Sequence, residues 1–203
     1  MSATSILSAQ RKTTSKTPSM ANPILQQKAP VIQKFGTVLE DSAIGLDSGV
    51  REKVCAFLNP ILADTMSLRD LYKKSHWQVE GPTFYQLHLL FDEHFKKQSK
   101  LVDLVAERIQ TMGGLAVAMA ADVAAMTRIQ HPPTGREEVP VIISRLLDAH
   151  KLILTDARAK AKEASELGDL GTNDMLVADV TRTNEFQVWF LSSHLVKMPL
   201  VET

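Results

Sequence analysis

Apolar residues along this chain recur every three or four positions, which is the spacing of one face of an α-helix. The first such segment predicts a helix from about residue 48 to residue 79, with Asp47 or Ser48 as its N-cap. Pro60 lies inside this helix and cannot donate a backbone hydrogen bond, so we expect a kink there. The dipeptide Gly81-Pro82 ends the segment. No stretch shows the strict alternation of apolar and polar residues that is typical of a β-strand.

Three more helices follow from the same pattern. A second helix is predicted from residue 82 or 83 to residue 112, where Gly113-Gly114 stops it. A third is predicted over residues 137–167, and a fourth from residue 172 or 173 to residue 195. The connection over residues 115–135 is long, and its Ala- and Met-rich stretch 117–126 predicts a short helix.

Four helices with one long connection between the second and third describe a ferritin-like four-helix bundle, because that connection must travel the length of the bundle. We therefore predict an all-α fold over residues 41–198, with a short helix in the long crossover. Residues 1–40 predict a flexible basic N-terminal arm, and residues 199–203 a C-terminal tail.

Charge is distributed unevenly along the 203 residues, although the net charge is zero. Residues 1–39 contain no acidic residue and five basic ones, which are Arg11, Lys12, Lys16, Lys28 and Lys34. The remaining 18 basic and 23 acidic residues give the rest of the chain a charge of −5, obtained as 18 minus 23. A basic arm on an acidic body is suited to contacting a polyanion such as DNA; alternatively, the charges only keep a flexible tail in solution.

Cys55 is the only cysteine, which excludes an intrachain disulfide and a zinc site built from thiolates. It lies within a helical apolar pattern, and we expect it to be buried. No window is apolar enough for a membrane-spanning helix, and the N-terminus lacks the apolar region of a secretory signal. We therefore expect a cytoplasmic protein.

Candidate metal ligands are concentrated in one part of the chain: His76, His88, Asp92, Asp103 and Glu107. On the second predicted helix, Asp92, Asp103 and Glu107 lie about 40°, about 60° and about 100° around the axis from His88, so the four share one face. Asp92 and Asp103 are nevertheless about 16 Å apart along the axis, too far for one metal site. Two antiparallel copies across a two-fold axis would bring His88 and Asp92 of one chain opposite Asp103 and Glu107 of the other. The spacing therefore predicts a metal site shared between subunits.

A di-iron centre within one chain of the bundle is not expected. Ordinary di-iron bundles use two Glu-x-x-His pairs, and none of the six histidines here has a glutamate three residues before it.

The stretch Lys74–Asp92 (KSHWQVEGPTFYQLHLLFD) resembles the signature of the Dps family, the ferritin-like mini-cages named after DNA-binding proteins from starved cells. The resemblance continues through Asp103-x3-Glu107-Arg108 and covers residues 46–196. Segments 44–46, 50–54 and 62–65 look most like cyanobacterial members. The resemblance implies a dodecameric cage that oxidises Fe(II), with hydrogen peroxide or dioxygen, at ferroxidase centres on its two-fold interfaces and stores Fe(III) inside. His76, His88 and Asp92 would come from one subunit, and Asp103 and Glu107 from its partner.

The resemblance also suggests accessory roles. Trp77 would donate an electron and quench leftover oxidant, or serve only as an interfacial aromatic. Asp148 and Asp156 match the region that lines iron-entrance pores, although they could be part of a solvated helix face. Zinc would compete with Fe(II) for the same five ligands, and DNA compaction by the basic arm is a separate candidate function. We expect the other histidines, His94, His131, His150 and His194, to be structural or exposed, and Trp189 to lie in the core.

Overall fold

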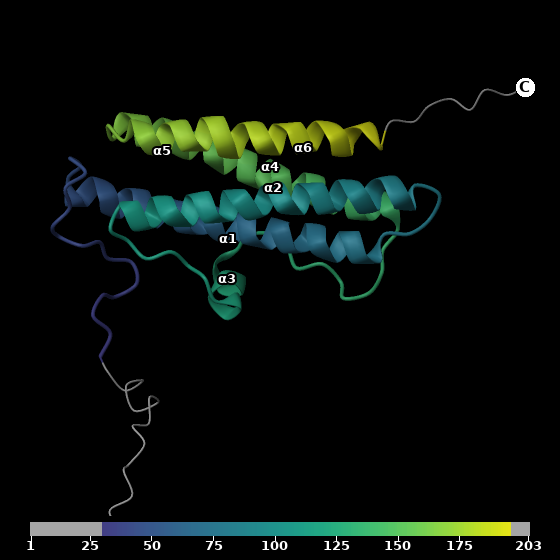
Figure 1. Cartoon of the computed structure of the whole chain (residues 1–203), viewed down its shortest axis with the longest axis horizontal. Coiled ribbons are helices and arrows are strands. Elements are labelled where there is room, and N and C mark those ends of the chain that lie inside the picture. Colours follow the sequence, from purple (N-terminus) through teal and green to yellow (C-terminus); the bar gives the residue numbers. More distant parts are fainter. Residues whose placement is uncertain (1–29, 196–203) are drawn as a thin grey trace, which may run out of the picture. The chain divides into compact units, whose positions relative to one another are not determined.

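The computed structural model describes residues 30–195, and every helix within them belongs to a body that begins at Gln33. Residues 30–32 belong to a separate unit and form no helix or strand. The predicted all-α fold is confirmed, because residues 30–195 contain helices and no strand. In chain order (Figure 1) the elements are α1 Ser48–Gln78, α2 Phe84–Thr111, α3 Ala120–Met126, α4 Val139–Glu166, α5 Leu170–Asp174, the π-helix η2 Met175–Thr181 and α6 Arg182–Ser193.

Helices α1 and α2 form an antiparallel hairpin, and a five-residue loop joins them. Gly81 in this loop has a φ of +98°, a value that residues with a Cβ rarely adopt. The loop therefore fixes how the last turn of α1 faces the first turn of α2. Helix α1 continues unbroken through Pro60, and its 31 residues match the predicted length.

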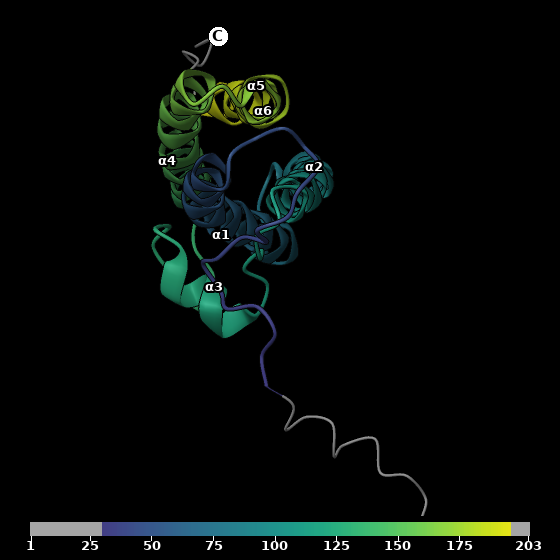
Figure 2. The same ribbon diagram turned by 90° about the vertical axis from the view of Figure 1, so that its left-hand side faces the viewer.

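The last predicted helix is a continuous run of three elements, α5, η2 and α6. This run packs along α4, which also contacts α1. The helices α1, α2 and α4 and the α5–η2–α6 run are the four long rods of a bundle, which Figure 2 views roughly along its length. Helix α3 belongs to the crossover and packs on α1 outside the four-helix arrangement.

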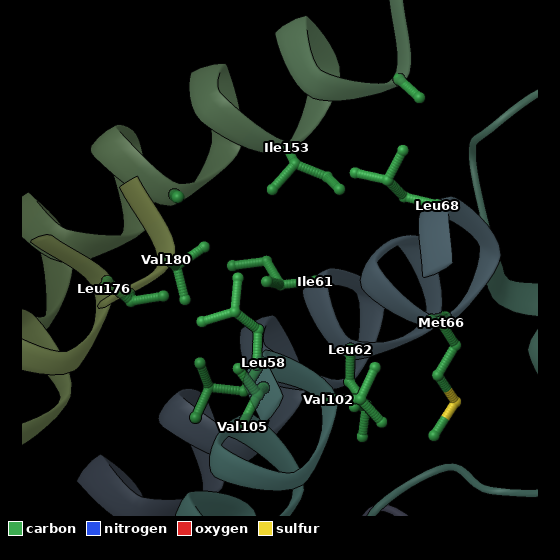
Figure 3. Packing of buried hydrophobic residues seen from close by; sticks show 14 of the residues in the cluster. Leu58, Ile61, Leu62, Met66, Leu68, Val102, Val105, Ile153, Leu176 and Val180 are labelled. Carbon is green, nitrogen blue, oxygen red and sulfur yellow. The ribbon is translucent and has the colours of Figure 1, made fainter. Parts of the chain in front are cut away.

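Apolar side chains from every long rod meet in one core (Figure 3). Leu58, Ile61 and Leu62 of α1 lie at its centre with Val105 of α2 and Ile153 of α4. The last rod contributes Leu176 and Val180 from η2. Burial of each such side chain stabilises the fold by about 1.5–3 kcal/mol.

Two buried charged residues fasten loops to this core. Arg51 is buried and donates hydrogen bonds to four backbone carbonyl oxygens, those of Leu39, Glu40, Leu46 and Met112. It thereby ties the segment before α1 to the end of α2. Asp64 has no exposed surface and accepts hydrogen bonds from Thr127 and Arg128, which anchors the crossover onto α1.

Cys55 is buried, as predicted, and packs directly against the chain at Gly114. A Cβ at Gly114 would lie 2.5 Å from the Cys55 sulfur, so only glycine fits there. Burial raises the pKa of this thiol.

Trp189 does not lie in the core, and that prediction was wrong. Its side chain is 64% exposed and clusters on the surface with Phe186 and Phe190. Among the helices in the described part of the chain, none is long and apolar enough to cross a membrane.

Candidate metal centre

His76 and His88 face each other across the hairpin, one in the last turn of α1 and the other in the second turn of α2. Their imidazole rings stack with centroids 3.8 Å apart and planes inclined by 23°. The Nδ1 atom of His76 lies 2.7 Å from the backbone oxygen of His88, and Nδ1 of His88 lies 2.9 Å from the backbone oxygen of His76. The two residues thus hold each other in a reciprocal arrangement.

These hydrogen bonds determine which nitrogen of each ring can bind a metal. A carbonyl oxygen only accepts, so each Nδ1 must carry the hydrogen that it donates. The Nε2 atom of each neutral ring is then unprotonated and keeps its lone pair. An imidazole whose Nδ1–H is bonded to a carbonyl is a common arrangement for metal-binding histidine. The hairpin therefore presents two preoriented nitrogen ligands.

Asp92 lies one helical turn after His88 and is held by two lysines. Its Oδ1 is 2.7 Å from Nζ of Lys73, and its Oδ2 is 2.8 Å from Nζ of Lys96. Hydrogen bonds to Lys73 and then to Lys96 hold the pKa of this carboxyl well below its usual range. Asp92 is therefore ionised and can serve as a ligand for a cation, which would compete with the lysines.

Asp103 and Glu107 lie farther along α2, and their side chains are exposed. Neither forms an ion pair with another residue of the described chain; Arg108 instead pairs with Asp169 and donates to Thr172 at 2.8 Å. Within residues 30–195, no three His, Cys, Asp or Glu side chains lie close enough to hold a metal ion. The fold thus brings His76 and His88 together, whereas Asp92 is held by its two lysines one helical turn after His88, and Asp103 and Glu107 lie farther along α2.

The residues predicted for accessory roles are in different surroundings. Trp77 is 70% exposed and lines a shallow depression with Lys73 and Phe95. Asp148 and Asp156 of α4 border another depression, which also includes Arg128. Arg128 bonds to Asp156 at 2.9 Å, whereas Asp148 is exposed and has no ion pair within the described part of the chain.

Of the other four histidines, two are exposed and two are buried. His131 and His194 are exposed, whereas His94 and His150 are fully buried and hydrogen-bonded to Tyr72. Sequence reasoning missed this buried polar group and the lysines around Asp92. The sequence did contain one signal for the buried polar group. His94 and Gln98 are four residues apart, a spacing that places both polar residues on the same face of α2, and this face is buried.

Most of the predicted DNA-binding arm lies outside the described residues. This applies to Arg11, Lys12, Lys16 and Lys28, and also to the predicted tail at 199–203. Lys34 is described and exposed. Nearby, Gln33 donates a hydrogen bond of 2.9 Å to the backbone oxygen of Gly113, so the segment around Lys34 is attached to the body.

The ferritin-like domain family matches residues 55–201 of this chain. A solved structure of DpsC from Streptomyces coelicolor has a TM-score of 0.83 and 53% sequence identity, covering 85% of this chain and all of that one. The nutrient stress-induced DNA-binding protein of Nostoc sp. is 30% identical over 167 residues, which cover 82% of this chain and 90% of that protein.

The crystal structure of a Dps protein from Vibrio cholerae, described as a member of a broad superfamily of ferritin-like diiron-carboxylate proteins, is also similar. It has a TM-score of 0.72 and 26% identity, and covers 81% of this chain and 99% of that one. The identity to the Streptomyces protein exceeds that to the cyanobacterial Nostoc protein.

Proposed function

The chain belongs to the Dps family of ferritin-like proteins, and on this premise we propose that it is a ferroxidase that stores iron. Membership supports iron storage and DNA protection in general. The observation that carries the specific proposal is the His76–His88 pair, in which each Nδ1 is bonded to a backbone oxygen and each Nε2 is left available to a metal. Imidazole and carboxylate together suit Fe(II), and carboxylates stabilise the harder Fe(III) product.

The complete centre requires two copies of the chain. His76, His88 and Asp92 of one subunit supply three ligands, and Asp103 and Glu107 of a two-fold-related subunit supply the other two. Support comes from the exposure of Asp103 and Glu107 and from their freedom from ion pairs within the described residues. An isologous interface would create two such centres in each dimer. We place six of these dimers in a dodecameric cage that encloses the Fe(III) product.

The reaction consumes a two-electron oxidant without releasing a radical. Two Fe(II) ions each give one electron to one molecule of hydrogen peroxide, which takes up two protons and leaves as two molecules of water. Both irons leave as Fe(III), which hydrolyses and mineralises. Trp77 donates an electron to oxidant that is left over after this reaction and so quenches it. Asp148 and Asp156 line pores through which Fe(II) arrives, attracted by negative charge.

The test is anaerobic loading with Fe(II), followed by hydrogen peroxide or dioxygen, while ferric absorbance is recorded. We expect rapid oxidation by the wild type with peroxide, and oxidation at the buffer rate in the double variant His88→Ala/Asp92→Ala. His131→Ala, which removes an exposed histidine elsewhere, is the control and should oxidise iron normally. A double variant as fast as the wild type would refute the assignment of the centre.

Zinc is the main competing occupant, since imidazole and carboxylate ligands also bind it well. Metal analysis of the purified protein distinguishes the two. If the purified protein contains stoichiometric zinc that Fe(II) does not displace, the ferroxidase proposal is refuted and the protein is a cage that holds zinc.

DNA binding by the arm is a second candidate function, favoured by the nutrient stress-induced DNA-binding relative. Many copies of a weak basic arm on one cage would bind DNA through multivalency, and binding would fall steeply with salt. The matched test replaces Arg11, Lys12, Lys16, Lys28 and Lys34 by Gln, which keeps the length of the arm. Loss of the gel shift with unchanged iron oxidation supports this function, and an unchanged gel shift refutes it.

A further inference from the structure

A chain of buried polar side chains crosses the interior of the bundle. Tyr72 of α1, His94 of α2, His150 of α4 and Asn184 of α6 have no exposed surface. The Tyr72 hydroxyl lies 2.5 Å from Nε2 of His150 and 3.0 Å from Nδ1 of His94. Nδ1 of His150 lies 2.7 Å from Oδ1 of Asn184. One side chain from each long rod therefore contributes to a single hydrogen-bonded chain.

The direction of each hydrogen bond follows from Asn184. Its Nδ2 donates to the backbone oxygen of Val180 at 2.7 Å, so the other atom of the amide, Oδ1, is an acceptor. Nδ1 of His150 must then carry a hydrogen, which leaves Nε2 of the neutral ring as an acceptor. The Tyr72 hydroxyl therefore donates to His150 and accepts from Nδ1–H of His94.

Tyr72 and His150 are both neutral near pH 7. Burial lowers the pKa of His150 to about 3, and it raises the pKa of Tyr72 well above its usual value. The phenol thus keeps its proton at rest, and a neutral base is already aligned to receive it. Hydrogen-bonded polar side chains in a bundle core usually specify one packing arrangement. Here Nε2 of His94 has no hydrogen-bond partner among the described residues, and the bonded groups also connect a phenol to a base.

We propose that Tyr72 is a one-electron donor whose phenolic proton passes to Nε2 of His150 when the ring is oxidised. The geometry supports this because the O···N separation is short and Asn184 already accepts the hydrogen on the far side of the histidine. Histidine is suited to shuttling protons. The imidazolium that forms would keep its Nδ1–H bond to Asn184, and the neutral tyrosyl radical would keep the bond that His94 donates.

The donor lies beside the proposed ferroxidase centre, and this part of the inference rests on the proposed function. Tyr72 precedes His76 by one turn of α1, about 6 Å along the axis. Its ring also lies 6.1 Å from that of Phe91, the residue before Asp92. Trp77, by contrast, is largely in solvent. A buried donor holds the radical away from DNA and other solutes.

The step balances when only one Fe(II) is available to a peroxide molecule. Hydrogen peroxide accepts one electron from Fe(II) and one from Tyr72, takes up two protons from solvent and becomes two molecules of water. The products are Fe(III), a neutral tyrosyl radical at Tyr72 and a protonated His150. The radical is later reduced by another Fe(II), and His150 returns the proton.

The chain has only two tyrosines, Tyr72 and Tyr85, which allows a sharp test. In the variant Tyr85→Phe, Tyr72 is the only tyrosine and its hydrogen bonds are unaltered. We would mix this protein, grown with normal or ring-deuterated tyrosine, with substoichiometric Fe(II) and excess peroxide, and record electron paramagnetic resonance on frozen samples. A radical signal that narrows on deuteration assigns the radical to Tyr72. A signal that deuteration leaves unchanged, or no signal, overturns the inference.

Two variants test the roles within the pair. Tyr72→Phe keeps the ring and should abolish the tyrosyl signal. His150→Gln keeps groups that can bond to Asn184 and Tyr72, but an amide is not a base, so the signal should fall at least about tenfold. An undiminished signal in His150→Gln would show that this histidine does not receive the proton.

A metal-free experiment separates this inference from the proposed function. A ruthenium complex photo-oxidised by a laser flash removes one electron from the protein without iron. A Tyr72 radical in this metal-free experiment, together with no oxidation of iron in the experiment with Fe(II) and peroxide, would support the donor pair and refute the ferroxidase. Normal iron oxidation without a Tyr72 radical in either experiment would refute the donor pair alone.

Discussion

Lys73 of α1 binds the carboxylate of Asp92 of α2 at 2.7 Å, at the position where a metal ligand is expected. The same Nζ lies 4.5 Å above the ring of Phe95, which helps to hold the lysine in place. Asp92 is thus kept ionised by a cation of the protein until a metal cation replaces it.

We predict that Lys73→Gln strengthens metal binding several-fold, since Asp92 loses a competitor while Lys96 remains. The same change should lower the free energy of unfolding by on the order of 0.5 kcal/mol at pH 7, as for other partly exposed ion pairs. Isothermal titration with Zn(II) and thermal unfolding measure the two effects. Lys162→Gln, which alters a loose exposed pair with Glu166, is the control and should change neither.

The stability loss of Lys73→Gln should depend on pH in a defined direction. The pKa of Asp92 in the folded chain lies below its ordinary value of 3.8, so the ion pair contributes fully above about pH 4. As the pH falls further, the unfolded chain takes up a proton first and this contribution is lost. The difference between variant and wild type should therefore shrink below pH 4. A difference that grows there would contradict the pairing.

Two inactive variants should restore activity when they assemble together. In a dimer of His88→Ala/Asp92→Ala with Asp103→Ala/Glu107→Ala, one interface centre receives both intact halves and the other receives both damaged halves. Random pairing makes half of the dimers mixed, and one of their two centres is intact, so about a quarter of wild-type oxidation should return. Co-refolded and separately refolded mixtures are compared. Equal, inactive mixtures would argue against a shared centre.

Gly81→Ala should destabilise the chain by about 1–2 kcal/mol, because φ is +98° at this position. It should also reduce metal affinity, since the loop sets the alignment of His76 with His88. Gly135→Ala is the matched control, because Gly135 lies in an open loop with no positive φ. Thermal unfolding and Zn(II) titration of both variants test this; equal effects would mean that the loop has no special role.

Asp64→Asn should cost about 2 kcal/mol or more, because a buried carboxylate that accepts several hydrogen bonds is replaced by an amide. Asp156→Asn removes a more exposed partner of the same arginine, Arg128, and should cost less. Chemical denaturation of the two variants measures the difference. A larger loss for Asp156→Asn would mean that Asp64 does not anchor the crossover.

Asp148→Asn should slow iron oxidation at low salt several-fold, whereas Asp156→Asn should slow it less because Arg128 already compensates the charge of Asp156. Initial rates over a range of salt concentrations check this. The difference should vanish at high salt, where charges are screened. Rates that do not depend on salt would exclude attraction by these carboxylates.

The helices could be predicted because apolar spacing and paired glycines are local features of the sequence. Gly81-Pro82 and Gly113-Gly114 marked both ends of α2 to within about two residues. The shared face of His88, Asp92, Asp103 and Glu107 was inferred from the same periodicity, and their role as metal ligands stays a prediction. Lys73 could not be found in this way, because its bond to Asp92 joins two helices and depends on their relative rotation.

The error at Trp189 came from judging the residue by its aromatic type and not by its position around the helix. Beyond η2, the polar residues Asn184 and Gln187 are buried, whereas Phe186 and Trp189 are exposed. At about 100° per residue, Asn184 lies about 80° around the axis from the buried Leu176, whereas Trp189 lies about 220° from it, on the opposite face. The helical period therefore places Trp189 outside the core, and its residue type alone does not.

Because Cys55 packs against Gly114, its thiol is a built-in probe of local opening. The sulfur is covered, and its raised pKa keeps it as the unreactive thiol. An alkylating reagent can therefore reach it only when α1 and the start of the crossover separate. Since this is the sole sulfhydryl, the rate of its labelling reports how often that corner of the folded chain opens.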